Sequence, residues 1–519
     1  MASVQDGEFF LKTFLLFCRI LGQFFGEGLL PRSPLNWFRI GNALWSSRPG
    51  YFFLLEMAAI RFPHREAVID EFGVLTFRQL LEEAEGLAIC LRERYEIGPG
   101  AKVGLIFSNH RGFILSLAAV TRLGADVMPL PPRLGKAQWE SLLQGRRVDL
   151  LIHEAEVSHE LDFFPSKMEW HPGTHSRGRL PRVTRPGQLV VLTSGTTGVS
   201  KGIRRNPKLE EVLPVTWGLW EGLPLALHRP MVLAIPLFHG YGLATLALSL
   251  FLGSPLRLAR RFDIETLLSR PGPEAPVLVT VPTLLWRWLQ KQNDVPALAG
   301  VITGSAPLTP SLCEKILERV GPKLYNLYGS TEAGVVSLAS PEMLQWSPGC
   351  VGRPLPGNEV RLRPAQAEVG EIEVRGPLVL QPGEDGWRRT GDLGRFDEKG
   401  SLLVCGRSDS MIVSGGENVY PHELAEVLER FPRLADSAVL VVDDEEFGQR
   451  LVAAVVPVSI QSFSLRELKE WLRDNLQRHK LPRDIYLLES LPRNALGKVE
   501  RRKLEGLLEG AHRAGGSPF

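Results

Sequence analysis

The stretch LVVLTSGTTGVSKG, residues 189–202, joins an apolar run to a loop rich in glycine and hydroxyl groups. Residues 189–192 have the composition of a buried strand. Three glycines, five hydroxyl side chains and Lys201 follow from residue 193 onward. Glycines let backbone N–H groups curl around an anion, hydroxyls add donors, and the lysine adds a positive charge. The stretch therefore predicts a phosphate-binding loop at the end of a strand.

Three other interpretations of this loop are weaker. A serine- and threonine-rich surface loop would not need Lys201. The motif of P-loop NTPases ends in Gly-Lys-Ser/Thr, which is absent here. Residues 198–202 match the Gly-x-Ser-x-Gly pattern of hydrolases, with Ser200 as the nucleophile. That pattern needs an apolar strand that runs directly into the serine turn, whereas residues 193–197 intervene here. Phosphate binding remains the better interpretation.

Strand-like and helix-like stretches alternate on both sides of the loop. AKVGLIF begins at Ala101, a helical apolar stretch covers 112–122, and ADVMPL covers 125–130. Further short apolar runs lie at 148–152, 231–235, 277–281, 300–303 and 324–327. Such runs, separated by helical patterns, indicate largely parallel sheets covered on both faces. We therefore predict an α/β fold whose large N-terminal domain has largely parallel sheets flanked by helices.

The pattern changes in the last third of the chain. Short strands with glycine and proline turns, including a hairpin turn at 398–400, predict a small antiparallel β subdomain over about 350–405. Beyond it the pattern is that of a small α+β domain, with helices over 417–431 and from Leu465, the second one capped by a Ser464–Glu467 capping box. Strands are expected at 437–442 and 451–458. The expected parts are an N-terminal extension over 1–50, a main domain over 51–408 and a C-terminal domain over 409–519.

Composition excludes several classes of protein. A length of 519 residues exceeds one ordinary core and predicts more than one domain. The 60 basic and 58 acidic residues leave a net charge of +2, so no nucleic-acid partner is expected. The five cysteines are scattered without a Cys-x-x-Cys pair, which indicates reduced thiols, no zinc site and a cytoplasmic protein.

The N-terminal segment FFLKTFLLFCRILGQFF, residues 9–25, is apolar but short for a membrane span. No basic stretch precedes it, which argues against a secretory signal. Lys12, Arg19 and Gln23 place a narrow polar stripe on an otherwise apolar helix. Such a helix either contacts a membrane surface peripherally or packs against its own domain, and the pattern leaves both open. Oligomeric state is not readable from the sequence.

Further blocks along the chain, taken with the loop, resemble the adenylate-forming superfamily of acyl-CoA synthetases, adenylation domains and luciferases. LTSGTTGVSKG is similar to the superfamily's phosphate loop, GSAPL at 304–308 to its adenine-side loop, and YNLYGSTE at 325–332 to its Tyr-Gly-x-Thr-Glu motif. RTGD at 389–392 and GR at 406–407 resemble its ribose-binding block and the start of its moving domain, and PRNALGK at 492–498 resembles its C-terminal lysine motif. The resemblance covers the chain from about Tyr51. The residues of these motifs are most similar to those of bacterial medium- and long-chain fatty acyl-CoA synthetases.

The resemblance implies a nucleotide site, and the residue types suit it. Tyr328 offers an aromatic face for adenine, while Asp392 and Arg407 bond ribose oxygens. Thr331 would donate to the α-phosphate, and Glu332 would hold Mg²⁺, because hard cations prefer carboxylate oxygens. The remaining ATP- and AMP-binding residues implied are Thr193, Ser194, Gly195, Thr196, Thr197, Gly198, Lys201, Gly304, Ser305, Ala306, Asn326 and Gly329.

The resemblance also implies the residues that act on the acid and the thiol. Lys498 would neutralise charge during attack of the carboxylate on the α-phosphate. His239 would gate or contact the acid, and Asp409 would be the hinge about which a mobile C-terminal domain rotates. The glycine-rich block with Ser414, Gly415 and Gly416 would then line a tunnel for the thiol.

The implied function is that of an ATP-dependent acid–thiol ligase. A carboxylic acid, expected to be a medium- or long-chain fatty acid, reacts with ATP to give acyl-AMP and pyrophosphate, and coenzyme A then takes the acyl group. An alternative is a ligase that loads a separate acyl carrier protein, since no carrier domain is fused to the chain. A non-catalytic nucleotide-binding protein would be expected to lack Glu332 or Lys498, yet both are present.

Overall fold

The chain folds into two compact units. Unit 1 comprises Met1–Thr280, Gln292–Ile302 and Leu355–Gly357, and unit 2 comprises Val281–Lys291, Thr303–Pro354 and Asn358–Phe519. The computed structural model describes residues 22, 26, 28, 33–132, 136–144, 146–193, 201–205, 209–261, 264–270, 272, 274–291, 295–364, 368–408, 412–414, 417–419, 421–444, 448–461, 463–477, 480–494 and 499–510.

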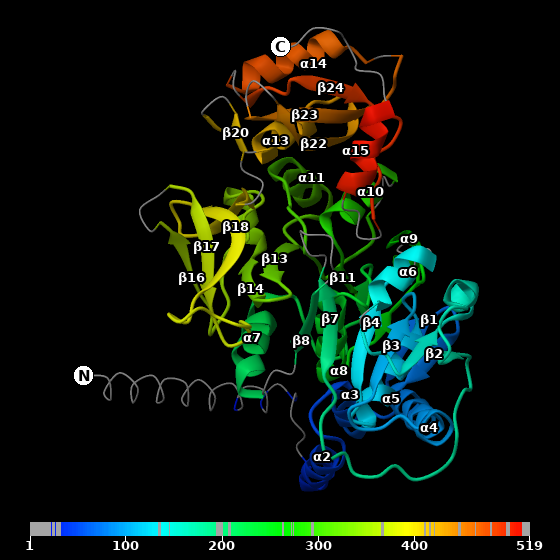
Figure 1. Cartoon of the computed structure of the whole chain (residues 1–519). Helices are drawn as coiled ribbons and strands as arrows, with labels where there is room; N and C mark the ends of the chain where they lie inside the picture. The colour runs from blue at the N-terminus through cyan, green and yellow to red at the C-terminus, as the bar shows by residue number, and fades with distance from the viewer. Residues whose placement is uncertain are drawn as a thin grey trace. The chain divides into compact units, whose positions relative to one another are not determined.

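Unit 1 contains a six-stranded sheet in the order β6-β5-β3-β4-β7-β8, of which Figure 1 labels β3, β4, β7 and β8. Its strands are β3 (Lys102–Ile106), β4 (Asp126–Leu130), β5 (Leu150–His153), β6 (Lys167–Glu169), β7 (Leu189–Thr193) and β8 (Lys201–Arg205). All neighbours are parallel except β7 and β8. β3, β4 and β5 are buried along nearly their whole length, because helices and strands cover both faces.

A second run of strands in unit 1 has the order β12-β11-β9-β10-β1-β2. Its strands are β1 (Glu66–Asp70), β2 (Gly73–Thr76), β9 (Met231–Leu233), β10 (Leu256–Arg257), β11 (Val277–Val279) and β12 (Gly300–Gly304). Only β2 runs antiparallel to its neighbour, at the edge. The predicted largely parallel α/β architecture is therefore confirmed.

Helices form the layer between these two sheets. α4 (Phe77–Tyr95) packs against β1 and β2, α5 (Arg111–Arg122) packs against β3 and β4, and the two helices pack against each other. Thr76 and Gln79 form a capping box at the start of α4, which ends at Glu96 in a left-handed conformation. All residues of α5 are buried. The other helical elements of unit 1 are α2 (Pro34–Ser47), α3 (Tyr51–Arg61), α6 (Lys136–Leu143), η1 (Ala155–Leu161), α7 (Leu209–Gly222), α8 (Gly240–Leu252) and α9 (Ile264–Leu268).

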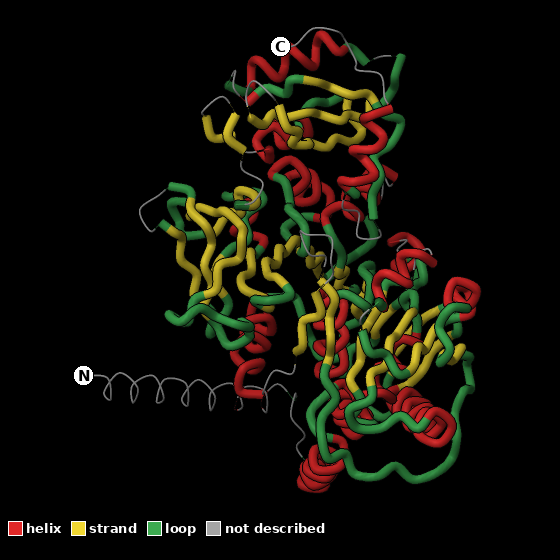
Figure 2. Tube along the Cα trace, viewed as in Figure 1, coloured by secondary structure: helices red, strands yellow, loops and turns green. Residues whose placement is uncertain are grey.

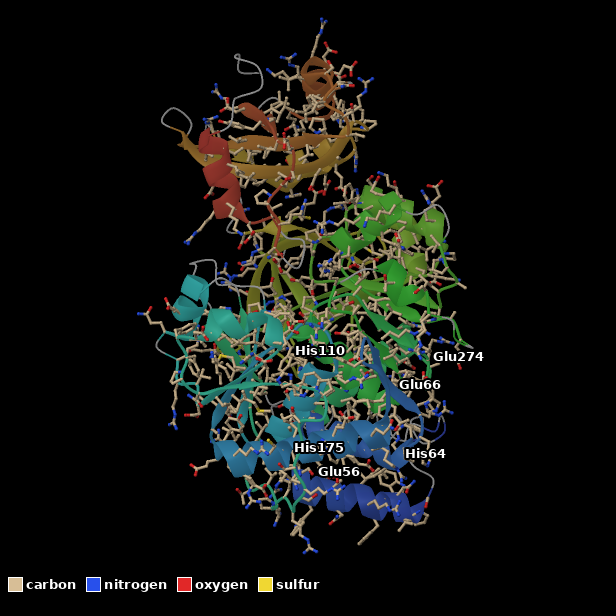
Figure 3. All side chains as sticks on the ribbon, turned by 90° about the vertical axis from the view of Figure 1, so that its right-hand side faces the viewer. Glu56, His64, Glu66, His110, His175 and Glu274 are labelled. Atoms are coloured by element: carbon tan, nitrogen blue, oxygen red, sulfur yellow. The ribbon has the colours of Figure 1, made fainter. Side chains whose placement is uncertain are left out.

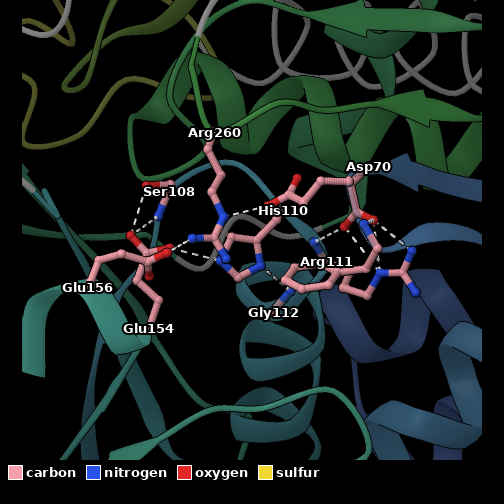
Figure 4. A network of polar contacts seen from close by, with 10 residues as sticks. Asp70, Ser108, His110, Arg111, Gly112, Glu154, Glu156 and Arg260 are labelled. Carbon is pink, nitrogen blue, oxygen red and sulfur yellow. Dashed lines mark hydrogen bonds and ion pairs between the residues drawn. The ribbon is translucent and has the colours of Figure 1, made fainter.

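A polar network lies where β3 and β5 end and α5 begins (Figure 4). The side chain of His110 caps α5 by accepting from the backbone of Gly112 at 3.1 Å, and its other ring nitrogen bonds Glu154 at 2.9 Å. Ser108 donates to the same carboxylate at 2.8 Å. Figure 3 also labels His110, whose side chain is fully buried. This arrangement satisfies polar groups that burial would otherwise leave unbonded.

Unit 2 has antiparallel sheets and helices. β13 (Leu324–Ser330), β14 (Gly334–Ala339) and β15 (Arg353–Pro354) pair in that order, and a separate four-stranded sheet comprises β16 (Glu359–Arg363), β17 (Gly370–Arg375), β18 (Arg388–Phe396) and β19 (Leu402–Arg407). Figure 2 shows these four strands as one yellow group. The turn between β18 and β19 contains Gly400 at φ 79°, in agreement with the predicted hairpin. Helices α10 (Pro282–Lys291), α11 (Pro310–Val320) and α12 (Pro341–Trp346) complete this part of the unit.

The C-terminal part of unit 2 is the predicted α+β segment. Its sheet is built from β20 (Ile412–Ser414), β21 (Glu417–Val419), β22 (Leu434–Asp444), β23 (Gly448–Pro457) and β24 (Asp484–Leu487). Its helices are α13 (Pro421–Glu429), α14 (Leu465–Asn475) and α15 (Arg501–Gly510).

Two local predictions for this segment were wrong in detail. The helix expected over 417–431 begins only at Pro421, because proline suits the first helical position and pushes the residue before it out of the helical region. The residues ahead of it form β21. The Ser464 side chain does accept from the backbone of Glu467, at 3.3 Å, but the Glu467 carboxylate bonds Arg433 at 2.5 Å instead of completing the capping box.

The cysteines in the described part of the chain form no disulfide. Cys90, Cys313 and Cys350 are buried and Cys405 is half-buried. Burial raises the pKa of the Cys313 and Cys350 thiols to about 11, so both stay protonated near neutral pH. They pack as small apolar side chains, as the sequence predicts.

Residues 9–25, predicted to form a mostly apolar helix, lie outside the described residues except Gly22. Within the part of the chain that is described, no helix is long and apolar enough to cross a bilayer. Peripheral membrane contact and a cytoplasmic location both stay predictions.

Candidate functional site

Three side chains predicted to bind the nucleoside meet in unit 2. The Tyr328 hydroxyl donates to Asp392 Oδ2 at 2.7 Å, and Arg407 Nη1 donates to Asp392 Oδ1 at 3.1 Å. Arg407 also donates to the backbone carbonyl of Thr390 at 3.2 Å. One carboxylate thus joins an aromatic residue and a guanidinium that lie far apart in the sequence.

Strand geometry brings Asp392 and Arg407 together. The two residues are directly opposed in the β18–β19 ladder. Gly391 has φ 75°, and a Cβ there would lie 2.8 Å from Arg407 Nη2, so only glycine leaves room for the guanidinium. The Thr390 hydroxyl accepts from the backbone N–H of Asp392 at 3.1 Å and donates to Ile372 O at 2.9 Å. These contacts hold the carboxylate where two donors reach it.

Tyr328 is held on β13 by close packing. A Cβ on the next residue, Gly329, would lie 2.2 Å from Gly334 O on the paired strand, and the ladder is irregular at this point. Burial and then the charge of Asp392 raise the pKa of Tyr328 far above its usual range. The hydroxyl is therefore a permanent donor near neutral pH.

The predicted adenine-side loop follows β12. Gly304 packs so closely that a Cβ would lie 2.7 Å from Leu327 O, and Ser305 has φ 62°, a left-handed conformation that costs free energy in a non-glycine residue. Strained backbone of this kind gathers at binding sites. Ala306 follows directly. The Asn326 side chain is buried and donates to Cys350 O at 2.9 Å, so its amide is used within the protein.

Thr331 and Glu332 lie in the turn between β13 and β14, and both are partly exposed. The backbone carbonyl of Glu332 accepts from Leu380 at 2.9 Å, and Ser330 Oγ accepts from the backbone of Ala333 at 3.0 Å. No cluster of three or more metal-ligating side chains occurs among the described residues. One partly exposed carboxylate fits Mg²⁺, which binds through one or two carboxylates together with substrate phosphates.

The predicted phosphate loop connects the antiparallel strands β7 and β8. Thr193 and Lys201 are opposed in the ladder, which places the two ends of the loop side by side. Residues 194–200, which include Ser194, Gly195, Thr196, Thr197 and Gly198, lie outside the described residues. The hydrolase interpretation of Ser200 is wrong, because a nucleophile elbow leads into a helix, whereas here strand β8 begins at Lys201.

His239 lies at the N-cap of α8, after β9. Its ring is tilted by 40° against Phe238, with the ring centroids 4.4 Å apart. Tyr241 donates its hydroxyl to Ile302 O at 3.2 Å, and a Cβ on Gly242 would lie 2.2 Å from Pro236 O. The start of α8 is thus packed tightly against the turn before it.

Lys498, Asp409, Gly415 and Gly416 lie outside the described residues, and of Ser414 only the backbone is described, in β20. The flanks of the lysine segment are well defined. Arg493 bonds both carboxylate oxygens of Asp436 on β22, at 3.0 and 2.6 Å. Arg493 and Val499 also form a β-bridge, and the backbone of Glu500 donates to Pro492 O at 2.9 Å. Both ends of segment 494–498 are therefore held to one sheet.

The sequence interpretation missed Thr390, Asp436 and the structural role of Arg493. Asp436 supports Arg493 from a distant position, and Thr390 combines a local bond to Asp392 with a bond to Ile372 on the neighbouring strand, which no local pattern reveals. Arg493 belongs to the lysine motif, and a guanidinium five residues before Lys498 could have prompted a search for an acidic partner.

The α/β unit, the antiparallel sheets with their tyrosine–aspartate–arginine cluster, and the strand-flanked glycine loop define an adenylate-forming enzyme. A family model described as "AMP-binding enzyme" matches residues 55–382, and one described as "AMP-binding enzyme C-terminal domain" matches residues 423–498. The chain belongs to the AMP-binding enzyme family.

Individual relatives in sequence and in structure are consistent with this family assignment. The chain is 30% identical to 2-succinylbenzoate–CoA ligase of Bacillus licheniformis, covering 87% of this chain and 98% of that protein. It is also 30% identical to indoleacetate–CoA ligase of Aromatoleum aromaticum, covering 87% and 95%. Its structure resembles o-succinylbenzoate CoA synthetase from Bacillus subtilis in complex with an acyl-adenylate intermediate, with a TM-score of 0.79, 25% identity and coverage of 91% and 99%. Another structure of that protein contains ATP and magnesium, at 26% identity, a TM-score of 0.77 and coverage of 87% and 99%.

The predicted class, an AMP-forming acyl-CoA synthetase that uses ATP, Mg²⁺ and coenzyme A, is therefore confirmed. The narrower expectation of a medium- or long-chain fatty acid is not supported, because these relatives are named for other acids.

Proposed function

We propose that this enzyme holds the nucleoside of ATP through Tyr328, Asp392 and Arg407 while a carboxylic acid attacks the α-phosphate. The observation that carries the proposal is the contact of these three side chains around one carboxylate, at 2.7 and 3.1 Å. Asp392 can accept from ribose hydroxyls, and the partly exposed Arg407 can donate to ribose oxygens. The strained loop at Ser305 brings backbone groups towards the adenine.

The chemical step brings a carboxylate anion against a phosphate anion, so charge must be neutralised during attack. The chain's own contributions are Lys201 and the N–H groups of the phosphate loop, Thr331, and Lys498 from the C-terminal segment. Mg²⁺ on Glu332 supplies further charge neutralisation when it is bound. Pyrophosphate leaves, and the acyl group stays on AMP.

Replacement of Lys498 tests this assignment. We expect Lys498→Ala to slow acid-dependent pyrophosphate release by about 10²- to 10³-fold, since one preorganised charge in a transition state contributes about 3–4 kcal/mol. The matched control is Lys503→Ala, which removes an exposed lysine of α15 that pairs with Glu500. Unchanged pyrophosphate release by Lys498→Ala would contradict the role.

Coenzyme A takes the acyl group, and we propose that it does so after residues from 409 onward rotate about Asp409 and bring Ser414, Gly415 and Gly416 to the site. Purified enzyme, ATP, acid and coenzyme A are expected to yield a thioester detectable by mass spectrometry. An adenylate that persists until an acyl carrier protein is added would instead support a carrier-loading ligase.

We infer that the acid has an apolar acyl group without a second charge. The support is α8, which we assign to the acid pocket and which carries no charged residue from Gly240 to Leu252. Burying a second carboxylate there without a partner would be costly. ATP–pyrophosphate exchange with indoleacetate, fatty acids of graded length, 2-succinylbenzoate and malonate tests this. Fastest exchange with either diacid would contradict the inference, and a preference for 2-succinylbenzoate would match the relatives' names.

A further inference from the structure

Helix α2 presents an apolar face to solvent in addition to the face that it buries. At 100° per residue, Asn36, Ile40, Ala43 and Ser47 form the inward stripe, where the last two are fully buried. A second stripe, about 120° wide, comprises Trp37, Phe38, Gly41, Leu44 and Trp45, all of them exposed. The inward stripe accounts for the buried side of α2, whereas the second stripe stays exposed, with Trp45 contacting Arg182 at its rim.

The exposure of this outer face is unusual for a water-facing helix. Phe38 is 76% exposed and Trp45 is 57% exposed. Among the described residues, five of the thirteen exposed large hydrophobic side chains belong to α2. Apolar residues scattered singly on a surface need no explanation, whereas a contiguous aromatic cluster marks an interaction site.

The helix is held firmly against unit 1. Ser47 Oγ donates to Glu56 of α3 at 2.8 Å, and Glu56 is labelled in Figure 3. The backbone of Val183 donates to Ser46 O at 2.9 Å, and Arg182 Nε donates to Trp45 O at 3.1 Å. The outer face is thus presented by a fixed element.

Basic side chains lie at the C-terminal end of this aromatic face. Arg48 follows α2, and α2 itself contains no aspartate or glutamate, while the carboxylate of Glu56 on α3 bonds Ser47 on the buried side of the helix. The Arg182 guanidinium lies 3.9 Å from the ring centroid of Trp45, at the rim of the face. Tryptophan and phenylalanine on one side of a helix, with Arg48 and Arg182 at its C-terminal end, suit the interface of a bilayer that carries anionic lipid.

We propose that the outer face of α2 docks this enzyme on the surface of an anionic lipid bilayer. The aromatic rings enter the boundary between head groups and acyl chains, and Arg48 and Arg182 meet lipid phosphates. The helix does not span the membrane, since its fourteen residues are too few. The proposal concerns attachment of the whole enzyme and is independent of which acid is activated.

Vesicle flotation of the full chain tests the proposal. Binding is expected to vesicles of phosphatidylcholine that contain phosphatidylglycerol as about one lipid in three, weaker binding to phosphatidylcholine alone, and loss at high salt. The double variant Trp37→Ser/Phe38→Ser is expected to bind at least about tenfold more weakly. The matched control is Val458→Ser/Ile460→Ser, which replaces two exposed apolar side chains elsewhere and is expected to bind as wild type. Equal binding by wild type and the α2 variant would overturn the proposal.

Quenching of tryptophan fluorescence by brominated lipid locates the contact even if the first variant folds poorly. The double variant Trp37→Phe/Trp45→Phe keeps the face apolar, so it is expected to bind vesicles yet lose most of the lipid-dependent quenching. Trp346→Phe removes another exposed tryptophan and is expected to keep the quenching. Quenching that survives in the α2 variant would overturn the proposal. So would a shift from dimer to monomer on Trp37→Ser/Phe38→Ser without lipid, which would make the face an interface between copies.

Discussion

At the scale of single residues, Tyr328 shows how burial and a charged neighbour define a chemical role. Its hydroxyl cannot ionise near neutral pH, because the buried ring and Asp392 both oppose a phenolate. It therefore always donates to Asp392, and this fixes the carboxylate against rotation. The remaining capacity of Asp392 to accept hydrogen bonds is what we assign to ribose.

Tyr328→Phe is expected to raise the KM for ATP by about tenfold, since one hydrogen bond to a charged group contributes about 1.5 kcal/mol. The aromatic face for adenine is retained, and the rate at saturating ATP should change little. ATP–pyrophosphate exchange measured over a range of ATP concentrations checks this. Tyr325→Phe on the same strand is the control, and an unchanged KM in Tyr328→Phe would remove the positioning role.

Glu154 carries a pH dependence of stability. Burial opposes its ionisation, but hydrogen bonds from His110 and Ser108 outweigh burial and hold its pKa below the usual 4.5. At a pH between the pKa of Glu154 in the folded protein and its higher pKa in the unfolded chain, the unfolded chain binds more protons. The stabilisation of the fold by ionised Glu154 is therefore complete above the unfolded-state pKa and is lost as pH falls through the folded-state pKa.

Glu154→Gln should therefore lower the free energy of unfolding at neutral pH by about 2–3 kcal/mol and flatten its decline below pH 4.5. Urea unfolding at a series of pH values measures both effects. Glu156→Gln is the control, because that carboxylate is half-exposed and pairs with Arg260 near the surface. An undiminished acid dependence in Glu154→Gln would show that other groups carry it.

At the scale of elements, paired strands and bridges hold the ends of the reactive segments. The β7–β8 pair places Thr193 opposite Lys201, and the bridge from Arg493 to Val499 closes the segment that carries Lys498. A strand pair or bridge thus defines where each of these segments, to which we assign the phosphate contacts and Lys498, begins and ends. The side chain that reinforces the second closure is Arg493, through its two bonds to Asp436.

Arg493→Ala is expected to slow adenylation at least about tenfold, because the segment that carries Lys498 loses the bidentate contact with Asp436 that holds its N-terminal end. Conversion of supplied acyl-adenylate to thioester should fall much less, since that step does not need Lys498. The control is Arg433→Ala, which breaks the half-exposed pair with Glu467 in the same domain. Equal losses in both half-reactions would indicate general destabilisation of the domain instead of positioning.

At the scale of the whole molecule, we propose that the two half-reactions use two arrangements of the segment from residue 409 onward. Asp409→Pro restricts the backbone φ angle at the proposed hinge. We expect it to spare pyrophosphate release and to slow thioester formation at least about tenfold, by hindering rotation. Asp409→Ala, which leaves φ free, is the control. Equal loss of both half-reactions in the proline variant would argue against a hinge at this position.

Much of the fold could be predicted because its signals are local. The strands at 102–106 and 126–130, the helix between them and the hairpin turn at Gly400 follow from apolar runs and turn residues. The start of α13 and the partner of Glu467 were missed. The first depends on competition between a strand and a helix, and the second on Arg433, which lies 34 residues away.

The sequence alone determined the enzyme class, because the phosphate loop, the Tyr-Gly-x-Thr-Glu block and the lysine motif each need particular residue types at short spacing. Only the tertiary structure decided that Ser200 is followed by a strand, that Tyr328 and Arg407 share Asp392, and that α2 exposes Trp37 and Phe38 while burying Ala43. The physical reason is that short-range sequence patterns indicate whether a segment is a helix or a strand and which chemical groups a motif contains. Burial, register and contacts between distant residues exist only once the chain has packed.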